Sequence, residues 1–536
     1  MKKRIISALV CCSMMVAATG CAGTNGAGKE AASGNSSSSE TTTGSAVETQ
    51  ASQDTDKAEA DGKTPKYVFL FIGDGMSYPQ FQAASDYLGA MSDQDYQKAE
   101  PSTDYEERNG AVLDGPQALN FMNFETAGTA VTYDSCSFAP DSASTATSIA
   151  TGHKTYSGMI NVDETGSEKF ETIAEKLHKQ KNMKVGVISS VNLNHATPAA
   201  FYAHQASRND YYEIGQELVD SEFEYFAGGG LKEVTGADED KESLYDLAES
   251  AGYKITYTQA DAEKITAGDE KVILIDEHLA DSDAMEYEID RQDGEWALAD
   301  YVKKGIEVLD NDNGFFMMCE GGKIDWACHA NDAGSTVNDT LAFADSVQVA
   351  VDFAQEHPDE TLILVTGDHE TGGLTIGFAG TDYDTYLSNL DNQKISFAQF
   401  DEQYMAKYKE ENTSFEDAMK DVEKLFGLKM SGDEGDKLVL TEYETERLRT
   451  AYDLAMTEYD PETYSQEQYV LYGTYNPFSV TITHILNNKS GIDFSSYSHT
   501  GLPVGVFADG AGASDFGGYY DNTEIYNKMA SLLDVK

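Results

Sequence analysis

Four apolar runs, each ending at glycine or polar residues, constrain the fold of this chain more than any other feature. They are residues 67–72, 184–188, 315–318 and 362–366. Asp74 follows the first run and Asp368 follows the last, each directly behind a glycine. Continuous apolar runs of this length are typical of strands buried on both faces of a parallel sheet. The sequence therefore predicts buried parallel strands whose carboxyl ends carry aspartate.

Helical patterns separate these runs, for example at residues 170–180 and 335–356. The alternation predicts an α/β fold with a mostly parallel central sheet and helices on both faces, within a domain at 64–536. In such sheets ligands bind beyond the carboxyl ends of the strands. Residues 385–475 differ, because they are acidic and helical in pattern, as at 415–428 and 442–459. We expect them to form a helical insertion beside or over the sheet.

The first 63 residues carry signs of export. Residues 1–20 combine a basic start with an apolar stretch too short to span a bilayer, which predicts a signal peptide. Small residues then lead into Cys21, as in a bacterial lipoprotein cleavage box; an ordinary cleaved signal that ends near a cysteine is the alternative. Residues 21–63 are rich in Ser, Thr, Gly and Ala, which predicts a flexible linker. We expect an extracytoplasmic lipoprotein, anchored to a membrane through lipid on Cys21, at the cell surface or in the periplasm.

The charge argues against a nucleic-acid-binding surface, and the cysteine content argues against a disulfide framework. The 536 residues include 93 acidic and 37 basic side chains, a formal charge of −56. Surfaces that bind nucleic acid need clustered Lys and Arg, so no such surface is expected here. Cys136, Cys319 and Cys328 follow the linker, and this odd number gives no disulfide framework, although one bridge remains open.

Aspartate and histidine gather near the predicted strand ends. Asp325 and His329 are four residues apart, so in a helix they share one face and could hold one metal ion. Asp368 and His369 offer a second oxygen and nitrogen pair, and His499 lies in a short polar turn. One such pair alone is weak evidence for a metal site, but several Asp and His groups at strand ends are stronger evidence. Mixed His and Asp ligands suit zinc or a similar divalent ion.

Two further stretches are ambiguous on their own. Ser142 stands at the start of a run of small residues at 141–152, where a helix N-terminus favours an anion. The simpler interpretation is a helix cap by Asp141 or Ser142, and that stretch alone favours it. Arg208 is one of few arginines, and a guanidinium binds two phosphate oxygens at once. An ordinary surface ion pair is the simpler interpretation, and Arg208 alone favours that too.

Taken together, these stretches form an ordered series of motifs. They are Phe71-Ile-Gly-Asp74-Gly75, Asp141-Ser142-Ala143, His195-Ala-Thr197-Pro with Ser207-Arg208, Glu320-Gly-Gly-Lys-Ile-Asp325 with His329, Thr366-Gly-Asp368-His369-Glu-Thr, and His499-Thr-Gly. The series resembles the bacterial and animal alkaline phosphatases. The resemblance covers about residues 65–535 and is weak across the insertion.

The resemblance implies a role for each matching position. Ser142 is expected to be the nucleophile, which forms a phosphoserine and also contacts metal, and Arg208 is expected to bind phosphate. Two zinc ions are expected in two ligand sets, the first being Asp325, His329 and His499 and the second Asp74, Asp368 and His369. Asp74, Thr197 and Glu320 are expected to hold one magnesium ion in a third site, beside His195.

Two positions depart from the enterobacterial pattern of the family. His195 stands where those enzymes have aspartate, and Trp326 stands where they have lysine. Animal enzymes share the histidine, and some cold-adapted bacterial enzymes have both replacements. The ion in the third site is therefore open: magnesium is expected, and another divalent ion could replace it. Cys319 and Cys328 are expected to pack rather than to bind metal, because the expected ligand sets are already full.

The resemblance implies hydrolysis of small phosphate monoesters at alkaline pH, and a homodimer is among its expectations. A phosphodiesterase of the same superfamily is the main alternative, although diesterases commonly use threonine at the nucleophile and lack the Arg208 block. A sulfatase would need Cys/Ser-x-Pro-x-Arg, which the residues after Ser142 lack. A phosphoglycerate or phosphopentose mutase is a weaker candidate. Outside the enzymes, a surface lipoprotein could bind phosphate or metal without turnover, and it would have no use for Ser142.

Overall fold

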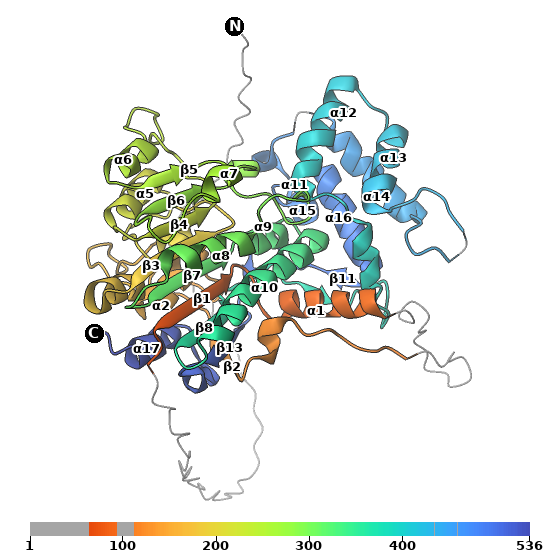
Figure 1. Ribbon diagram of the computed structural model, residues 1–536. Coiled ribbons are helices and arrows are strands. Elements are labelled where there is room, and N and C mark those ends of the chain that lie inside the picture. Colours follow the sequence, from red (N-terminus) through yellow and green to blue (C-terminus); the bar gives the residue numbers. More distant parts are fainter. Residues whose placement is uncertain (1–63, 94–111, 434, 458) are drawn as a thin grey trace, which may run out of the picture. The chain divides into compact units, whose positions relative to one another are not determined.

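The centre of the fold is strand β1 (Tyr67–Gly73), which is buried along its whole length. The structure, a computed structural model, describes residues 64–93, 112–433, 435–457 and 459–536 (Figure 1). β1 pairs in parallel with β7 (Phe315–Gly321) on one side and with β8 (Thr361–Gly367) on the other. Gly73 lies opposite both Gly321 and Gly367, so the three strands end at the same level. The polar residues that follow them therefore meet at one edge of the sheet.

The sheet has ten strands in the order β14-β2-β13-β8-β1-β7-β3-β4-β6-β5. Among the described strands of this sheet, β13 (Val504–Gly510) alone runs antiparallel to both of its neighbours. The others are β2 (Thr126–Val131), β3 (Lys184–Ser189), β4 (Tyr225–Gly228), β5 (Lys254–Thr256), β6 (Val272–Ile275) and β14 (Gly518–Asp521). The predicted α/β class with a mostly parallel sheet is confirmed.

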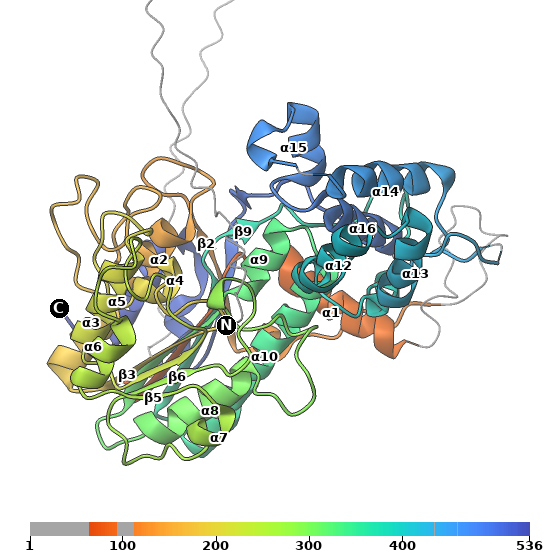
Figure 2. The ribbon, with the colours of Figure 1, turned by 90° about the horizontal axis from the view of Figure 1, so that it is seen from above.

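Helices cover both faces of the sheet, because successive side chains of a strand point to opposite faces. Phe69 and Phe71 of β1 belong to one apolar core, whereas Val68 and Leu70 belong to the other. Figure 2 shows the two layers on either side of the strands. The first layer contains α1 (Tyr78–Ser92), α8 (Leu298–Leu309) and α10 (Ala333–Glu356). The second contains α2 (Ser142–Thr151), α4 (Ala196–Ala199), α5 (Tyr211–Asp220), α6 (Leu244–Ser250) and α17 (Thr523–Leu532).

The insertion is helical, as expected, and it lies to one side of the sheet (Figure 2). Its helices, with the one that follows it, are α11 (Phe397–Phe400), α12 (Ala406–Glu411), α13 (Phe415–Phe426), α14 (Glu442–Ala455), α15 (Gln466–Tyr472) and α16 (Pro477–Ser490). Aromatic contacts join them: the ring of Phe478 lies 4.9 Å from that of Tyr452 and 6.4 Å from that of Phe415. Two helices are shorter than predicted. α13 stops at Phe426 because Gly427 adopts a left-handed φ of 73°, and α14 stops at Ala455, shortly before Pro461.

Several predictions about the start of the chain are not addressed by the fold. The predicted signal peptide at 1–20, the lipidation site Cys21 and the linker at 21–63 lie outside the described residues. The described residues all belong to one unit, Lys57–Lys536. None of their helices has the length and apolar character needed to cross a bilayer. Cys136 is exposed and Cys319 and Cys328 are buried, all as free thiols.

Candidate active site

The candidate residues converge at the carboxyl edge of the sheet from elements far apart in sequence. Asp74 follows β1, Glu320 is the last residue but one of β7, and Asp368 and His369 follow β8. Ser142 is the first residue of α2, while Asp325 and His329 lie on the short helix α9 (Lys323–His329). His499 begins the two-residue strand β12 (His499–Thr500), which pairs with β9 (Glu370–Thr371). The parallel register alone brings the strand-end residues together.

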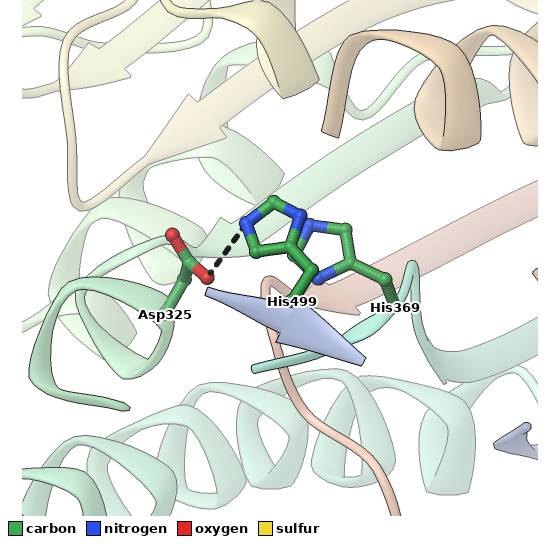
Figure 3. Close-up of side chains that lie close together, drawn as sticks. All are labelled: Asp325, His369 and His499. Carbon is green, nitrogen blue, oxygen red and sulfur yellow. Dashed lines mark ion pairs between the residues drawn. The ribbon is translucent and has the colours of Figure 1, made fainter. Parts of the chain in front are cut away.

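The first donor group combines one turn of α9 with β12. His329 Nε2 lies 3.3 Å from Asp325 Oδ2 and 3.0 Å from His499 Nε2, so the helical spacing places both residues as predicted. His499 Nε2 lies 3.6 Å from Asp325 Oδ1, the ion pair drawn in Figure 3. The two imidazoles are held from behind, since Nδ1 of His329 donates to the Tyr497 carbonyl and Nδ1 of His499 to that of Pro140, each at 2.6 Å. Both Nε2 atoms therefore remain available as acceptors for a metal.

The second donor group surrounds the serine. His369 Nε2 lies 3.2 Å from Asp74 Oδ1 and 3.4 Å from Asp368 Oδ2. Ser142 Oγ lies 3.1 Å from that same nitrogen and 3.5 Å from Asp74 Oδ1. The rings of His369 and His499 are stacked 3.7 Å apart, so the two donor groups are adjacent (Figure 3). The serine hydroxyl thus faces the same space as the carboxylates.

The third donor group is formed by Asp74, His195 and Glu320, whose ligand atoms lie within 4.8 Å of one another. Thr197 Oγ1 lies 3.5 Å from Asp74 Oδ2, so the predicted threonine is also present. Glu320 Oε2 accepts a hydrogen bond from Ser189, whereas the buried Glu320 Oε1 and His195 Nδ1 have no protein partner. Buried polar atoms without partners are costly, and a cation would satisfy the carboxylate oxygen.

The electrostatics of the site also call for cations. Burial, together with the nearby charge of Asp368, raises the pKa of Asp74 well above its usual range. Burial likewise raises the pKa of Asp368, and it raises that of Glu320 to about 7. So many carboxylates cannot all be ionised in a buried site without compensating positive charge. The donor set of carboxylate oxygens and imidazole nitrogens fits divalent ions of the zinc and magnesium kind.

Arg208 lies beside the nucleophile candidate. Its Nη1 is 2.9 Å from Asp141 Oδ2, and its Nη2 is 3.4 Å from His195 Nε2. Asp141 caps α2 by accepting from the Ser144 amide at 3.1 Å, as the simpler sequence interpretation proposed. The cap and the ion pair therefore share one residue: Asp141 caps α2 and holds the Arg208 guanidinium next to the helix N-terminus that begins at Ser142.

Several supporting side chains of the site are not predicted from the sequence. Thr371 Oγ1 donates to Asp325 Oδ1 at 2.5 Å, and Thr145 Oγ1 donates to Asp368 Oδ2 at 3.0 Å. Ser189 donates to Glu320 from the end of β3. Ser189 also follows an apolar run, so the rule that identified Asp74 could have found it. Thr371 belongs to the motif at 366–371, but nothing local marks its contact or that of Thr145, because their partners come from other elements.

The comparison with known proteins identifies the family. The family model described as alkaline phosphatase matches residues 65–535. This chain belongs to the alkaline phosphatase family. Alkaline phosphatase 4 of Bacillus subtilis is 27% identical over 492 residues, which cover 90% of this chain and 92% of that protein. Alkaline phosphatase 3 of the same organism is 30% identical and covers 73% of this chain and 77% of that protein.

Solved alkaline phosphatases have the same fold. The cold-active enzyme of a psychrophilic Shewanella is 27% identical, with a TM-score of 0.68, and the match covers 87% of this chain and 99% of that one. One structure of the enzyme from the Antarctic bacterium TAB5, a mutant with magnesium bound in its M3 site, is 25% identical, with a TM-score of 0.56 and coverage of 88% and 99%. The chain is therefore a phosphatase of a metal-dependent family, whose general reaction is phosphomonoester hydrolysis.

Proposed function

We propose that this alkaline phosphatase hydrolyses small phosphate monoesters through a phosphoserine formed on Ser142. The observation that carries the proposal is the position of the Ser142 hydroxyl. It is buried at the start of α2 and lies within 3.5 Å of both Asp74 and His369. A hydroxyl with no catalytic role would not need to face two groups that can bind metal. Likeness to the family supports the same assignment.

The proposed ions are two zinc and one magnesium. Zinc would bind to the group of Asp325, His329 and His499 and to the group of Asp74, Asp368 and His369 beside Ser142. Magnesium would bind to the third group, Asp74, Thr197 and Glu320 with His195 nearby. When bound, such ions act as Lewis acids that stabilise negative charge on oxygen.

The proposed reaction has two displacements at phosphorus. Ser142 Oγ attacks in line, so a bond from Oγ to phosphorus forms as the ester bond breaks and the alcohol leaves with a proton. Water then attacks the phosphoserine from the opposite side, which releases phosphate and returns the Ser142 hydroxyl. Arg208 binds phosphate oxygens with its planar guanidinium throughout. Positioning and charge stabilisation supply most of the rate.

The test replaces the nucleophile and follows both turnover and the covalent intermediate. We expect Ser142→Ala to lower kcat for an aryl phosphate by at least about 10³-fold, because the displacement loses its nucleophile. Acid quench of the zinc- and magnesium-loaded wild type with labelled substrate should trap phosphate on Ser142. Ser531→Ala, an exposed position on α17, is the matched control and should behave as wild type. Full activity of Ser142→Ala would contradict the mechanism.

The same assay addresses the alternatives. Removing metals should abolish turnover, and zinc plus magnesium should restore it. Turnover of a phosphate diester in preference to the monoester would favour the diesterase. Phosphate binding by the fully metallated protein without any turnover would favour a binding lipoprotein.

We also propose that the protein acts outside the cytoplasm. The supporting features are the signal-like residues 1–20 and the expected lipid on Cys21, followed by the linker at 21–63. One relative is a membrane-bound alkaline phosphatase of Bombyx mori. It is 27% identical to this chain, and the match covers 66% of this chain and 69% of that protein. A homodimer stays a prediction of the family resemblance.

A further inference from the structure

Glu370 is a buried carboxylate that the proposed reaction does not use. It lies between His369 and Thr371 in β9 and is fully buried. Its oxygens accept hydrogen bonds from Gln80 Nε2 at 2.7 Å and from the Thr500 hydroxyl. They also accept from the amides of the turn that follows, Gly373 at 3.1 Å and Leu374 at 3.2 Å. Four donors on one buried carboxylate fix its position firmly.

Thr500 is the next residue after the metal-ligand candidate His499. The two residues make up the whole of β12, which pairs antiparallel with β9 so that Thr500 lies opposite Glu370 and His499 opposite Thr371. A ladder of two residues is short and holds its strand weakly. The hydrogen bond from the Thr500 side chain to Glu370 therefore holds β12 to β9 a second time, directly beside His499.

We propose that the Glu370–Thr500 pair is a positioning device for His499, holding its backbone where the imidazole meets Asp325 and His329. The inference rests on the proposed role of His499 as a metal ligand. The hydrogen bonds described for the Glu370 side chain go to Gln80, Thr500 and the turn amides, so its side-chain link to His499 runs through Thr500. Its backbone is also joined directly to His369 of the second group, which is why the test changes Thr500. A ligand that is ordered in advance loses less conformational entropy when the ion binds. The pair should thus set the affinity of one metal site and leave the others alone.

Glu370 has a second role that the test must separate. Its bonds to Gly373 and Leu374 stabilise the turn in which Gly372 and Gly373 adopt φ values of 86° and 58°. Replacing Glu370 therefore perturbs that turn as well as β12. Thr500 is the better position for a substitution, because removing its hydroxyl breaks the hydrogen bond to Glu370 and leaves the bonds from Glu370 to the turn in place.

The experiment measures zinc release from the metal-loaded protein into a chromophoric chelator. Thr500→Val keeps the shape of the side chain and loses the hydroxyl, so one zinc should leave about 10–100-fold faster than in wild type. The second zinc should leave at the wild-type rate. Thr500→Ser restores the hydroxyl and should restore slow release of both ions. Thr375→Val on the nearby strand β10 (Thr375–Ile376) removes an exposed threonine hydroxyl and should change neither rate.

Each other outcome overturns the inference in a distinguishable way. If both zinc ions leave Thr500→Val at the wild-type rate, the positioning role is overturned. Equal acceleration of both zinc ions, together with a lower melting temperature of the metal-free protein, would show general loosening and overturn it as well. In the Glu370→Met background, which has no acceptor for the Thr500 hydroxyl, a further full effect of Thr500→Val would mean that the two residues do not act as a pair. A wild type that binds no zinc would overturn the metal assignment and this inference together.

Discussion

Arg208 is the residue whose orientation is most clearly set before any substrate binds. Asp141 Oδ2 accepts from its Nη1 at 2.9 Å and also from the Gly158 amide at 2.9 Å. A planar guanidinium fixed in this way presents several donors in one geometry, whereas an ammonium presents a point charge on a flexible chain. Preorganised donors at a phosphate site are worth more than charge alone.

We expect Arg208→Lys to lower kcat/KM for an aryl phosphate by about 10–100-fold, because charged hydrogen bonds to phosphate are lost while the charge stays. Steady-state kinetics of the metal-loaded enzyme measure this. Arg449→Lys is the matched control, since Arg449 makes an exposed pair with Glu416 at 2.9 Å on the insertion. Unchanged kcat/KM in Arg208→Lys would show that only the charge matters there.

Residues at strand ends could be predicted from the sequence, and Ser189 could have been found by the same rule, but the supporting partners Thr371, Glu370 and Thr145 could not. Asp74 and Asp368 follow apolar runs, so the local sequence predicts that both lie at strand ends. Thr371 and Glu370 stand in a recognised motif, but their contacts with Asp325 and Thr500 depend on how α9 and β12 approach β9. Such contacts are set by tertiary packing, which no single stretch of sequence encodes.

At the scale of elements, Thr197 lies on α4 and Arg208 lies in the segment that joins α4 to α5, and His204 stabilises that segment. His204 Nε2 lies 3.3 Å from Glu175, and Nδ1 lies 3.6 Å from Glu217. Burial alone would lower the pKa of His204, but these two carboxylates raise it to about 9. The charged histidine therefore stabilises the fold fully below its unfolded pKa of about 6.5, and this contribution is lost as the pH rises through about 9.

We expect His204→Gln to lower the free energy of unfolding by about 1–2 kcal/mol at pH 6, and by much less at pH 10. Urea unfolding of wild type and variant at both pH values gives the difference. His278→Gln serves as the control for loss of an exposed histidine, since His278 lies at the surface with its Nε2 3.5 Å from Glu295. A destabilisation that is equal at both pH values would show that packing, and not the ion pairs, explains the effect.

Elements with a continuous apolar pattern were predictable, and those made of small residues were not. β1, β7 and β8 match runs that the sequence identifies, extended by one to three residues. β2 consists of Thr, Ala, Gly and Val and is only partly buried, so it lacks the run of large apolar residues that marks β1, β7 and β8, although it is as long as β3. β13 pairs between β8 and β2, and its antiparallel direction follows from chain topology rather than from its own residues.

At the scale of the whole molecule, a formal charge of −56 surrounds a site that is built to bind an anion. Divalent ions, when bound, and Arg208 would provide positive charge locally, so the net charge would not oppose binding inside the site. Outside it, the potential is that of an acidic surface, which repels an approaching phosphate dianion. The two fields act at different ranges, because salt screens the distant surface charges more than the buried ones.

We therefore expect kcat/KM for an aryl phosphate to rise by about two- to tenfold as ionic strength increases from about 10 to about 150 mM, while kcat changes little. Screening shortens the range of the surface repulsion to about 8 Å at the upper value, so association becomes faster without altering the bound complex. A phosphate ester with a cationic leaving group is the control, since its smaller net charge should weaken the dependence. If kcat/KM instead falls with salt, the positive charge of the site extends beyond its mouth and steers the substrate in, and the acidic envelope then serves solubility alone.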